Sequence, residues 1–332
     1  MPGSPRKDKP NRFTRRDFED QFPDDAACLD YLWRRLYSAD GEHAECPSAK
    51  CQGRTRKFHR VKNRAKSYSC DSCGHHLHPT AGTIFHKSTT PLKDWFLAIF
   101  LLSATRCGIS AKQIEREIGV TYKTAWRMHN RIRQLLEGDD VGEQLTGEVE
   151  IDETAYGRRP RASDGPMTRR EGTIWAQQHK TTVFAMVERG GRVRAFVVPD
   201  RSKATLHGEI MRHVSPDATI YTDEWALYRG LSDHFKAHYQ IKHADRVYAR
   251  GHVHTQTIEG FFGNVKRGIS GVYHHVSPKY LTSYVTEYAF RYNHRDDQRP
   301  MFKAFLGGVR VDRPRFEPAF PPKRPRRPGL AS

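Results

Sequence analysis

The chain has 332 residues, of which 37% are hydrophobic and 11% aromatic, so it is long enough for about two or three domains and is not disordered by composition. Its 56 Lys and Arg exceed its 38 Asp and Glu and give a formal net charge of +18, which indicates a polyanionic partner, with nucleic acid the first to consider. The longest apolar run, residues 95–102, is far shorter than the ~20 residues of a membrane span, and the amino-terminal residues lack the apolar core of a signal peptide. We therefore expect neither a membrane protein nor a secreted one.

The amino-terminal segment is predicted to hold a basic flexible arm followed by one helix. Residues 1–17 are rich in Pro and Arg. Residues 18–38 carry apolar side chains at helical spacing, so we place an amino-terminal helix within residues 18–42.

Four of the six cysteines form two close pairs within residues 43–88, Cys46-x4-Cys51 and Cys70-x2-Cys73. Each pair can present two thiolates to one ion, so the four sulfurs can close a tetrahedral structural Zn²⁺ site in a zinc ribbon. The alternatives are chance pairs of buried thiols or redox pairs. The spacer is strongly basic, and we expect it to contact phosphates, although a solvated basic face is the alternative; its candidate DNA-binding residues are Lys62, Arg64 and Lys66.

Residues 90–140 are predicted to be helical. A buried helix is expected from Thr90 to Thr105, and two shorter helices within residues 109–136 are separated by Gly119, with Thr121 as the cap of the second. Two short helices joined by a turn with Gly are typical of a helix-turn-helix, and an ordinary helical hairpin is the alternative. The second helix is basic, which favours DNA contact; its candidate residues are Lys123, Arg127 and Arg131, with Arg133 further along.

From Gly147 the hydrophobic period changes from 3.6 to 2 and predicts a mixed α/β domain at residues 147–305. The expected strands are 148–157, 181–189, 192–199, 218–224 and 239–244. The expected helices are 201–213, a short one from Trp225, 257–266 and 278–292. Residues 158–176 are polar and Arg-rich and are expected to form a loop, and residues 306–332 a basic disordered tail.

Three acidic residues have positions that single them out. Asp152 lies within the first strand of this domain, Asp223 ends the fourth, and Glu259 begins a helix. Each alone would be a surface or capping acid. Together they would repel one another unless cations neutralised them, and two Mg²⁺ or Mn²⁺ ions about 3.5–4 Å apart would suit such oxygen ligands and phosphodiester chemistry. Glu153 is expected to point to the opposite face of the sheet.

The sequences IDET at 151–154, YTDEW at 221–225 and, above all, residues 254–295 resemble the bacterial insertion-sequence transposases that combine an amino-terminal zinc ribbon with an RNase H-like DDE domain. The resemblance implies an α/β fold in which an RNase H-like mixed sheet, flanked by helices, follows the zinc ribbon and the helix-turn-helix. It implies that Asp152, Asp223 and Glu259 form the metal-binding catalytic triad and that Lys266 is an accessory catalytic residue. Gln256 departs from the family pattern, in which Asn is expected.

The activity that this resemblance implies is that of a DNA transposase. It would bind terminal inverted repeats and catalyse two-metal-ion strand cleavage and 3′-OH strand transfer, as a homodimer or higher oligomer in the bacterial cytoplasm, associated with the nucleoid. We expect His254 and Arg267 to contact DNA, and Arg291 and Arg295 to be free for phosphates. The alternatives are a DNA-binding regulator derived from a transposase and an RNase H-like nuclease of RNA–DNA hybrids.

Overall fold

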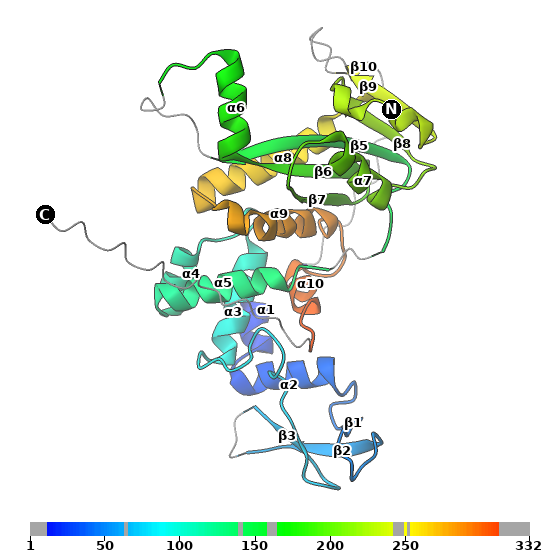
Figure 1. Ribbon diagram of the computed structural model, residues 1–332. Helices are drawn as coiled ribbons and strands as arrows, with labels where there is room; N and C mark the ends of the chain where they lie inside the picture. Colours follow the sequence, from blue (N-terminus) through cyan, green and yellow to red (C-terminus); the bar gives the residue numbers. More distant parts are fainter. Residues whose placement is uncertain are drawn as a thin grey trace, which may run out of the picture. The chain divides into compact units, whose positions relative to one another are not determined.

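The computed structural model describes residues 12–62, 66–138, 142–157, 165–241, 249–250 and 253–311. These residues divide into two compact units. What we call the amino-terminal unit comprises Phe13–Leu102, Ala111–Leu135 and the described residues from Phe305. What we call the sheet unit comprises Ser103–Ser110 and Leu136–Ala304. Figure 1 labels their helices and strands.

The amino-terminal unit begins with two helices, where a single one was expected. Helix α1 spans Arg15–Gln21 and α2 spans Asp25–Leu36. The two helices are separate because a proline precedes Asp24 and cannot continue the hydrogen bonding of α1. The Asp24 side chain accepts a hydrogen bond from the Ala27 N–H and caps the start of α2. A capping box between Thr14 and Asp17 starts α1, so ordered structure begins inside the range expected for the arm.

A small antiparallel sheet follows, formed by β1 (His43–Glu45), β2 (Thr55–Arg60), β3 (Tyr68–Cys70) and β4 (His76–Leu77) in that order. It packs on α2 through aromatic side chains. The Trp33 ring stacks on Tyr68 with ring centroids 4.2 Å apart and also contacts Phe58 at 5.4 Å. This packing gives the short strands the core that they are too small to build alone.

Helices follow in the region that the sequence predicts to be helical. Helix α3 spans Leu92–Ala104, α4 spans Ala111–Ile118 and α5 spans Tyr122–Gln134. Gly119 has a φ of +76°, which a residue with a side chain rarely adopts, and it makes the turn between α4 and α5. The Thr121 side chain then accepts the Thr124 N–H and caps α5, as expected.

The sheet unit is built on one five-stranded mixed sheet. Its strands are β5 (Glu148–Gly157), β6 (Lys180–Glu188), β7 (Val193–Val198), β8 (Thr219–Asp223) and β9 (Ala237–Ile241), in the order β7-β6-β5-β8-β9. The β5–β6 and β6–β7 pairs are antiparallel, and the β5–β8 and β8–β9 pairs are parallel. A short hairpin of β10 (Ala249–Arg250) and β11 (Val253–His254) precedes the next helix.

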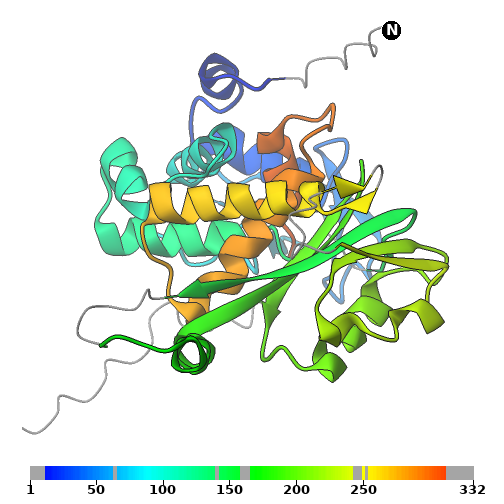
Figure 2. The ribbon, with the colours of Figure 1, turned by 90° about the horizontal axis from the view of Figure 1, so that it is seen from above.

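Helices cover both faces of this sheet (Figure 1 and Figure 2). Helix α7 (Lys203–His213) lies on one face, and α8 (Gln256–Gly268) and α9 (Pro278–Asn293) lie on the other. Short 3-10 turns at Ala226–Tyr228 (η2) and Leu231–Asp233 (η3) connect β8 to β9, a π-helical turn at Ile269–Tyr273 (η5) follows α8, and α10 spans Met301–Gly307.

Two expectations for loops were wrong. Residues within the expected 158–176 loop belong to α6 (Arg169–His179), which projects from the sheet (Figure 1), while residues 158–164 lie outside the described residues. The expected 306–332 tail starts later, because α10 extends to Gly307 and Val309 is fully buried. Residues 312–332 lie outside the described residues.

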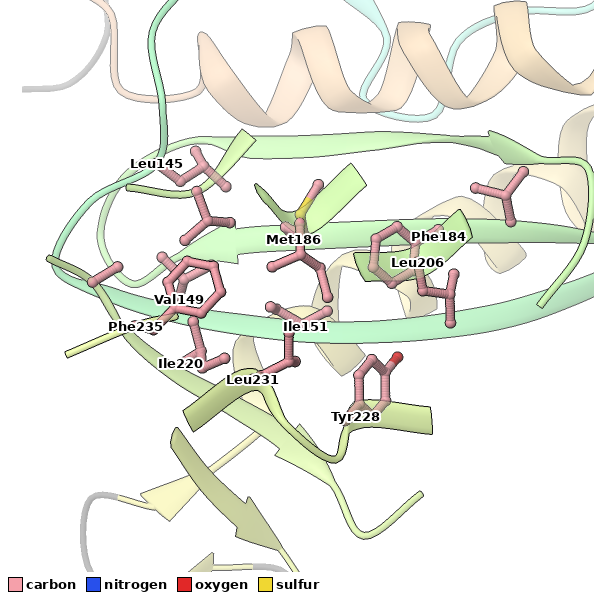
Figure 3. Close-up of a cluster of buried hydrophobic side chains, with 14 residues drawn as sticks. Leu145, Val149, Ile151, Phe184, Met186, Leu206, Ile220, Tyr228, Leu231 and Phe235 are labelled. Carbon is pink, nitrogen blue, oxygen red and sulfur yellow. The ribbon is translucent and has the colours of Figure 1, made fainter. Parts of the chain in front are cut away.

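Alternation along β5 divides its side chains between two cores. Val149 and Ile151 enter the cluster under α7, together with Met186 and Tyr228 (Figure 3). The cluster under α8 and α9 takes alternate residues of β6, beginning with Val183. Successive side chains of a strand point to opposite faces, so the even-numbered residues of β5 face α8 and α9. The acidic residues at even-numbered positions of β5 therefore lie on the α8 side of the sheet, and Glu153 lies on the α7 side.

Candidate active site

Asp152 and Asp223 lie on neighbouring strands and on the same face of the sheet. In the parallel β5–β8 pair, Glu150 is opposite Tyr221. This is the last pair of the β5–β8 ladder, and Asp152 and Asp223 each follow it by two residues, Asp223 as the last residue of β8. Both side chains are partly exposed. Because the two strands run in the same direction and side chains alternate along each, both carboxylates point to the face of the sheet that α8 covers.

Glu259 joins them from α8. It lies in the first turn of that helix and is exposed. Burial raises the pKa of Asp152 to about 7, with further contributions from the negative charges of Glu153, Asp223 and Glu259. Burial is the largest of these causes, and the charges of Asp223 and Glu259 act in the same direction.

The three carboxylates suit a hard cation. Among the described residues, no Lys, Arg or His side chain is within ion-pair distance of Asp152, Asp223 or Glu259. Clustered carboxylates without cationic partners are electrostatically unfavourable, and a divalent ion with oxygen ligands such as Mg²⁺ or Mn²⁺ would relieve their repulsion. Oxygen donors of this kind are those that Mg²⁺ and Mn²⁺ prefer, although among the described residues the group of potential ligands with atoms within 4.8 Å of one another is the four-cysteine cluster and not these carboxylates.

Glu153 lies on the opposite face of β5, as expected from its neighbour Asp152. Its carboxylate accepts a hydrogen bond of 2.5 Å from the hydroxyl of Tyr228, a member of the core under α7. Burial raises the pKa of Glu153, and the nearby Asp223 charge adds to the rise. Glu153 thus lies beside Asp152 in sequence, but its side chain is bound by Tyr228 on the other face of the sheet.

A buried carboxylate that sequence reasoning missed, Glu150, connects β5 to α8. It is 0% exposed, and its oxygens accept hydrogen bonds from the Ile258 N–H and the Thr257 hydroxyl, both at 3.0 Å. The Arg189 guanidinium contacts it at 2.7 Å and the His254 Nδ1 atom at 3.1 Å. Alternation along β5 could have indicated that Glu150 and Asp152 share one face, but the position of α8 was needed to show that Glu150 is buried against it.

Three other predicted residues lie in or beside α8. Lys266 and Arg267 are exposed, and Lys266 follows Glu259 by seven residues, or about two turns of the same face. The Arg267 guanidinium donates to the Asn264 side chain. His254, which was expected to contact DNA, is one-quarter exposed and directs Nδ1 at Glu150.

The expectation that Arg291 and Arg295 are free for phosphates was wrong. Arg291 is buried on α9, where it forms an ion pair with Glu287 at 2.7 Å and donates to the Thr105 carbonyl. The Arg295 guanidinium stacks on the ring of Tyr292 and donates to backbone carbonyls. These arginines hold the helix in place.

The four cysteines of the predicted zinc ribbon come together. All four are free thiols, and their Sγ atoms lie within 4.8 Å of one another. Cys46 and Cys73 are 3.6 Å apart, and Cys51 and Cys70 are 3.9 Å apart. Four sulfurs ~2.3 Å from a tetrahedral ion would be separated by about 3.8 Å, so this cluster can hold Zn²⁺.

The basic residues expected to bind DNA differ in their exposure. Lys62 and Lys123 are exposed, Lys66 and Arg127 are partly exposed, and Arg64 lies outside the described residues. Arg131 donates to the Ile84 carbonyl at 3.0 Å, and burial lowers its pKa. Arg133, counted with the basic face of α5, is instead fully buried against His129.

The described residues include no helix that is both long enough and apolar enough to cross a membrane. The apolar run in α3 is buried within the amino-terminal unit.

Comparisons with known proteins identify the family. A model described as an ISXO2-like transposase domain matches residues 144–293, the stretch that carries the three carboxylates. An uncharacterized protein in transposable element ISH50 of Halobacterium salinarum is 32% identical over 261 residues, covering 74% of this chain and 84% of that protein. An uncharacterized transposase-like protein of Haemophilus influenzae is 28% identical over 105 residues, covering 32% of this chain and 84% of that protein.

Among solved structures, the simian T-cell lymphotropic virus intasome in complex with PP2A regulatory subunit B56 gamma matches 67% of this chain and 76% of that chain. The identity is 12% and the TM-score is 0.29, a likeness too weak to assign a fold. The family model and the ISH50 relative are decisive, and they show that the chain belongs to the insertion-sequence transposases with an ISXO2-like transposase domain.

Proposed function

We propose that this transposase cleaves and joins DNA with the three carboxylates of the sheet unit, as an RNase H-like DDE enzyme that requires Mg²⁺ or Mn²⁺. The observation that supports the proposal is that Asp152 and Asp223 lie on neighbouring parallel strands with their side chains on the face of the sheet covered by α8, the helix whose first turn carries Glu259. The strand order supports it, because three antiparallel strands followed by two parallel ones, with the first strand at the centre, are typical of RNase H-like domains.

In this proposal Asp152 and Asp223 would be the ligands of two divalent ions, and Glu259 would be a further ligand of one of them. When bound, such ions make water or a 3′-OH more nucleophilic and neutralise charge on the leaving oxygen of a phosphodiester. Lys266, on the same helix as Glu259, contacts a substrate phosphate. No Ser or Tyr is assigned as a nucleophile, so no covalent protein–DNA intermediate is expected.

The amino-terminal unit is proposed to bind the terminal inverted repeats of the element. Cys46, Cys51, Cys70 and Cys73 hold a structural Zn²⁺, which leaves no open position for chemistry. The exposed amines of Lys62 and Lys123 are the first candidates for phosphate contacts, with Lys66 and Arg127 beside them. Joining two ends requires two active sites, so we propose a homodimer or a higher oligomer.

The test is cleavage and strand transfer on DNA that carries the ends of the element, in Mg²⁺ and in Mn²⁺. The Asp223→Ala variant removes one ligand, and Glu224→Ala, which changes the exposed neighbouring carboxylate, is the matched control. We expect nicking at the repeat boundary by the wild type and by Glu224→Ala, and at least a 100-fold loss in Asp223→Ala while binding persists. Specific binding without cleavage by the wild type in either metal would favour a DNA-binding regulator, and cleavage confined to RNA–DNA hybrids would favour a nuclease.

A further inference from the structure

We propose that Glu150 is a positioning residue, which holds the start of α8 so that Glu259 completes the cation site with Asp152 and Asp223. This inference rests on the proposed function of those three carboxylates. It assigns a role to an acidic residue that has no access to solvent and does not itself contact the cation.

The contacts of Glu150 place it at the junction of the two elements that supply ligands. It lies two residues before Asp152 on β5, and it accepts the N–H of Ile258, the residue before Glu259. Its other oxygen accepts the Thr257 hydroxyl. A single buried carboxylate thus connects the backbone that carries Asp152 to the backbone that carries Glu259, through hydrogen bonds of 3.0 Å.

The charge of Glu150 is suited to this task. The first N–H groups of a helix have no partner inside the helix and attract a negative charge, and Glu150 supplies it to α8 from outside the helix. A charged acceptor forms stronger hydrogen bonds than a neutral one, which restricts the movement of the first turn.

Arg189 makes the buried charge tolerable and extends the network. Its guanidinium contacts Glu150 at 2.7 Å, stacks 4.1 Å above the ring of Tyr221 and donates to the His254 carbonyl at 2.7 Å. It also contacts the more exposed Glu148 at 3.2 Å. A buried carboxylate needs such a partner, and Arg189 at the same time fixes the residue that leads into α8.

Mn²⁺ binding to the full chain, with zinc retained in the four-cysteine cluster, measures this role without relying on catalysis. Free Mn²⁺ is followed by electron paramagnetic resonance in titrations of the wild type, Glu150→Gln and Glu259→Gln. Glu148→Gln is the matched control, because Glu148 also contacts Arg189 and accepts a hydrogen bond from the hydroxyl of Tyr221, on β8. We expect Glu150→Gln to raise the Kd for Mn²⁺ about ten-fold and Glu148→Gln to change it by less than two-fold.

The outcomes separate this inference from the proposed function. If Glu259→Gln weakens Mn²⁺ binding and Glu150→Gln binds like the wild type, the positioning role is wrong and the cation site stands. If the wild type binds no Mn²⁺, or Glu259→Gln changes nothing, the cation site itself is wrong and the positioning role falls with it.

A second variant covers the case in which Glu150→Gln does not fold. Thr257→Val removes one donor to Glu150 and leaves every charge in place. We expect it to raise the Kd for Mn²⁺ about three-fold, with the zinc content and the circular dichroism spectrum of the wild type. An unchanged Kd in this variant would overturn the inference.

Discussion

At the scale of single residues, the buried pair of Glu287 and Arg291 shows how α9 is attached to its surroundings. The two charges lie one helical turn apart, with side chains 0% and 9% exposed. Arg291 also donates to the Thr105 carbonyl at 2.8 Å, and the neighbouring Tyr288 hydroxyl donates to the Cys107 carbonyl at 2.9 Å. The segment 103–110 is thus held by side chains of α9 within the sheet unit.

Removing one member of this pair leaves the other charge buried, which is costly. We expect Arg291→Met to lower the free energy of unfolding of the sheet unit by about 3–5 kcal/mol and the double variant Glu287→Leu/Arg291→Met to recover most of that loss. Arg212→Met, which breaks the exposed pair with Glu209, should cost less than about 1 kcal/mol. Urea unfolding of the four proteins checks this, and a small loss in Arg291→Met would show that Glu287 is not charged there.

The pair also shows why the prediction that Arg291 is free for phosphates was wrong. RYNHR reads as a basic surface motif unless the acid one turn before Arg291 is taken as its partner, and the sequence does not reveal which face of α9 is buried. The burial of Glu150 was equally hard to predict, because the polar positions of an alternating strand normally face solvent. The strands that carry Asp152 and Asp223 were predictable because each has an alternating pattern, whereas the proximity of these two acids to Glu259 stays a prediction.

At the scale of elements, the fit of α8 against α9 depends on a residue without a side chain. A Cβ atom added to Gly268 would lie 1.5 Å from the Tyr288 hydroxyl oxygen, whereas one added to Gly263 would meet only the flexible end of Arg267, at 3.4 Å. Both glycines lie within α8, and Gly268, its last residue, keeps helical backbone angles. They therefore form a matched pair in one helix.

We expect Gly268→Ala to destabilise the protein by about 1–3 kcal/mol, because Tyr288 must move and lose its hydrogen bond to the Cys107 carbonyl. Gly263→Ala should instead stabilise it by up to about 1 kcal/mol, the difference in helix propensity. Thermal unfolding measures both. Equal effects of the two substitutions would mean that α8 and α9 are not packed as described.

Elements with a clear hydrophobic period were predictable, and those without one were not. The five strands of the sheet begin and end within about three residues of their expected positions, because alternation marks a half-buried strand. Helix α6 was taken for a loop, since its sequence is polar and has few apolar positions to mark a face. The division of the first helix at Asp24 could have been predicted from the proline before it.

At the scale of the whole molecule, the two units carry two chemically different sets of candidate metal ligands. The amino-terminal unit offers four sulfurs, which suit Zn²⁺, and the sheet unit offers carboxylate oxygens, which suit Mg²⁺ or Mn²⁺. The net charge of +18 is consistent with a polyanionic substrate for such a protein. Because the ligand types differ, the two sites can be distinguished in a single experiment.

The most direct test of the central claim is an anomalous diffraction measurement on crystals of the full chain soaked in Mn²⁺, with data collected at the manganese and zinc edges. The zinc signal at Cys46, Cys51, Cys70 and Cys73 is the internal control for an intact protein. We predict a manganese peak bonded to oxygens of Asp152 and Asp223, with Glu259 completing the shell, and its loss in Asp223→Ala. A zinc peak at the cysteines with no manganese at the carboxylates would contradict the account.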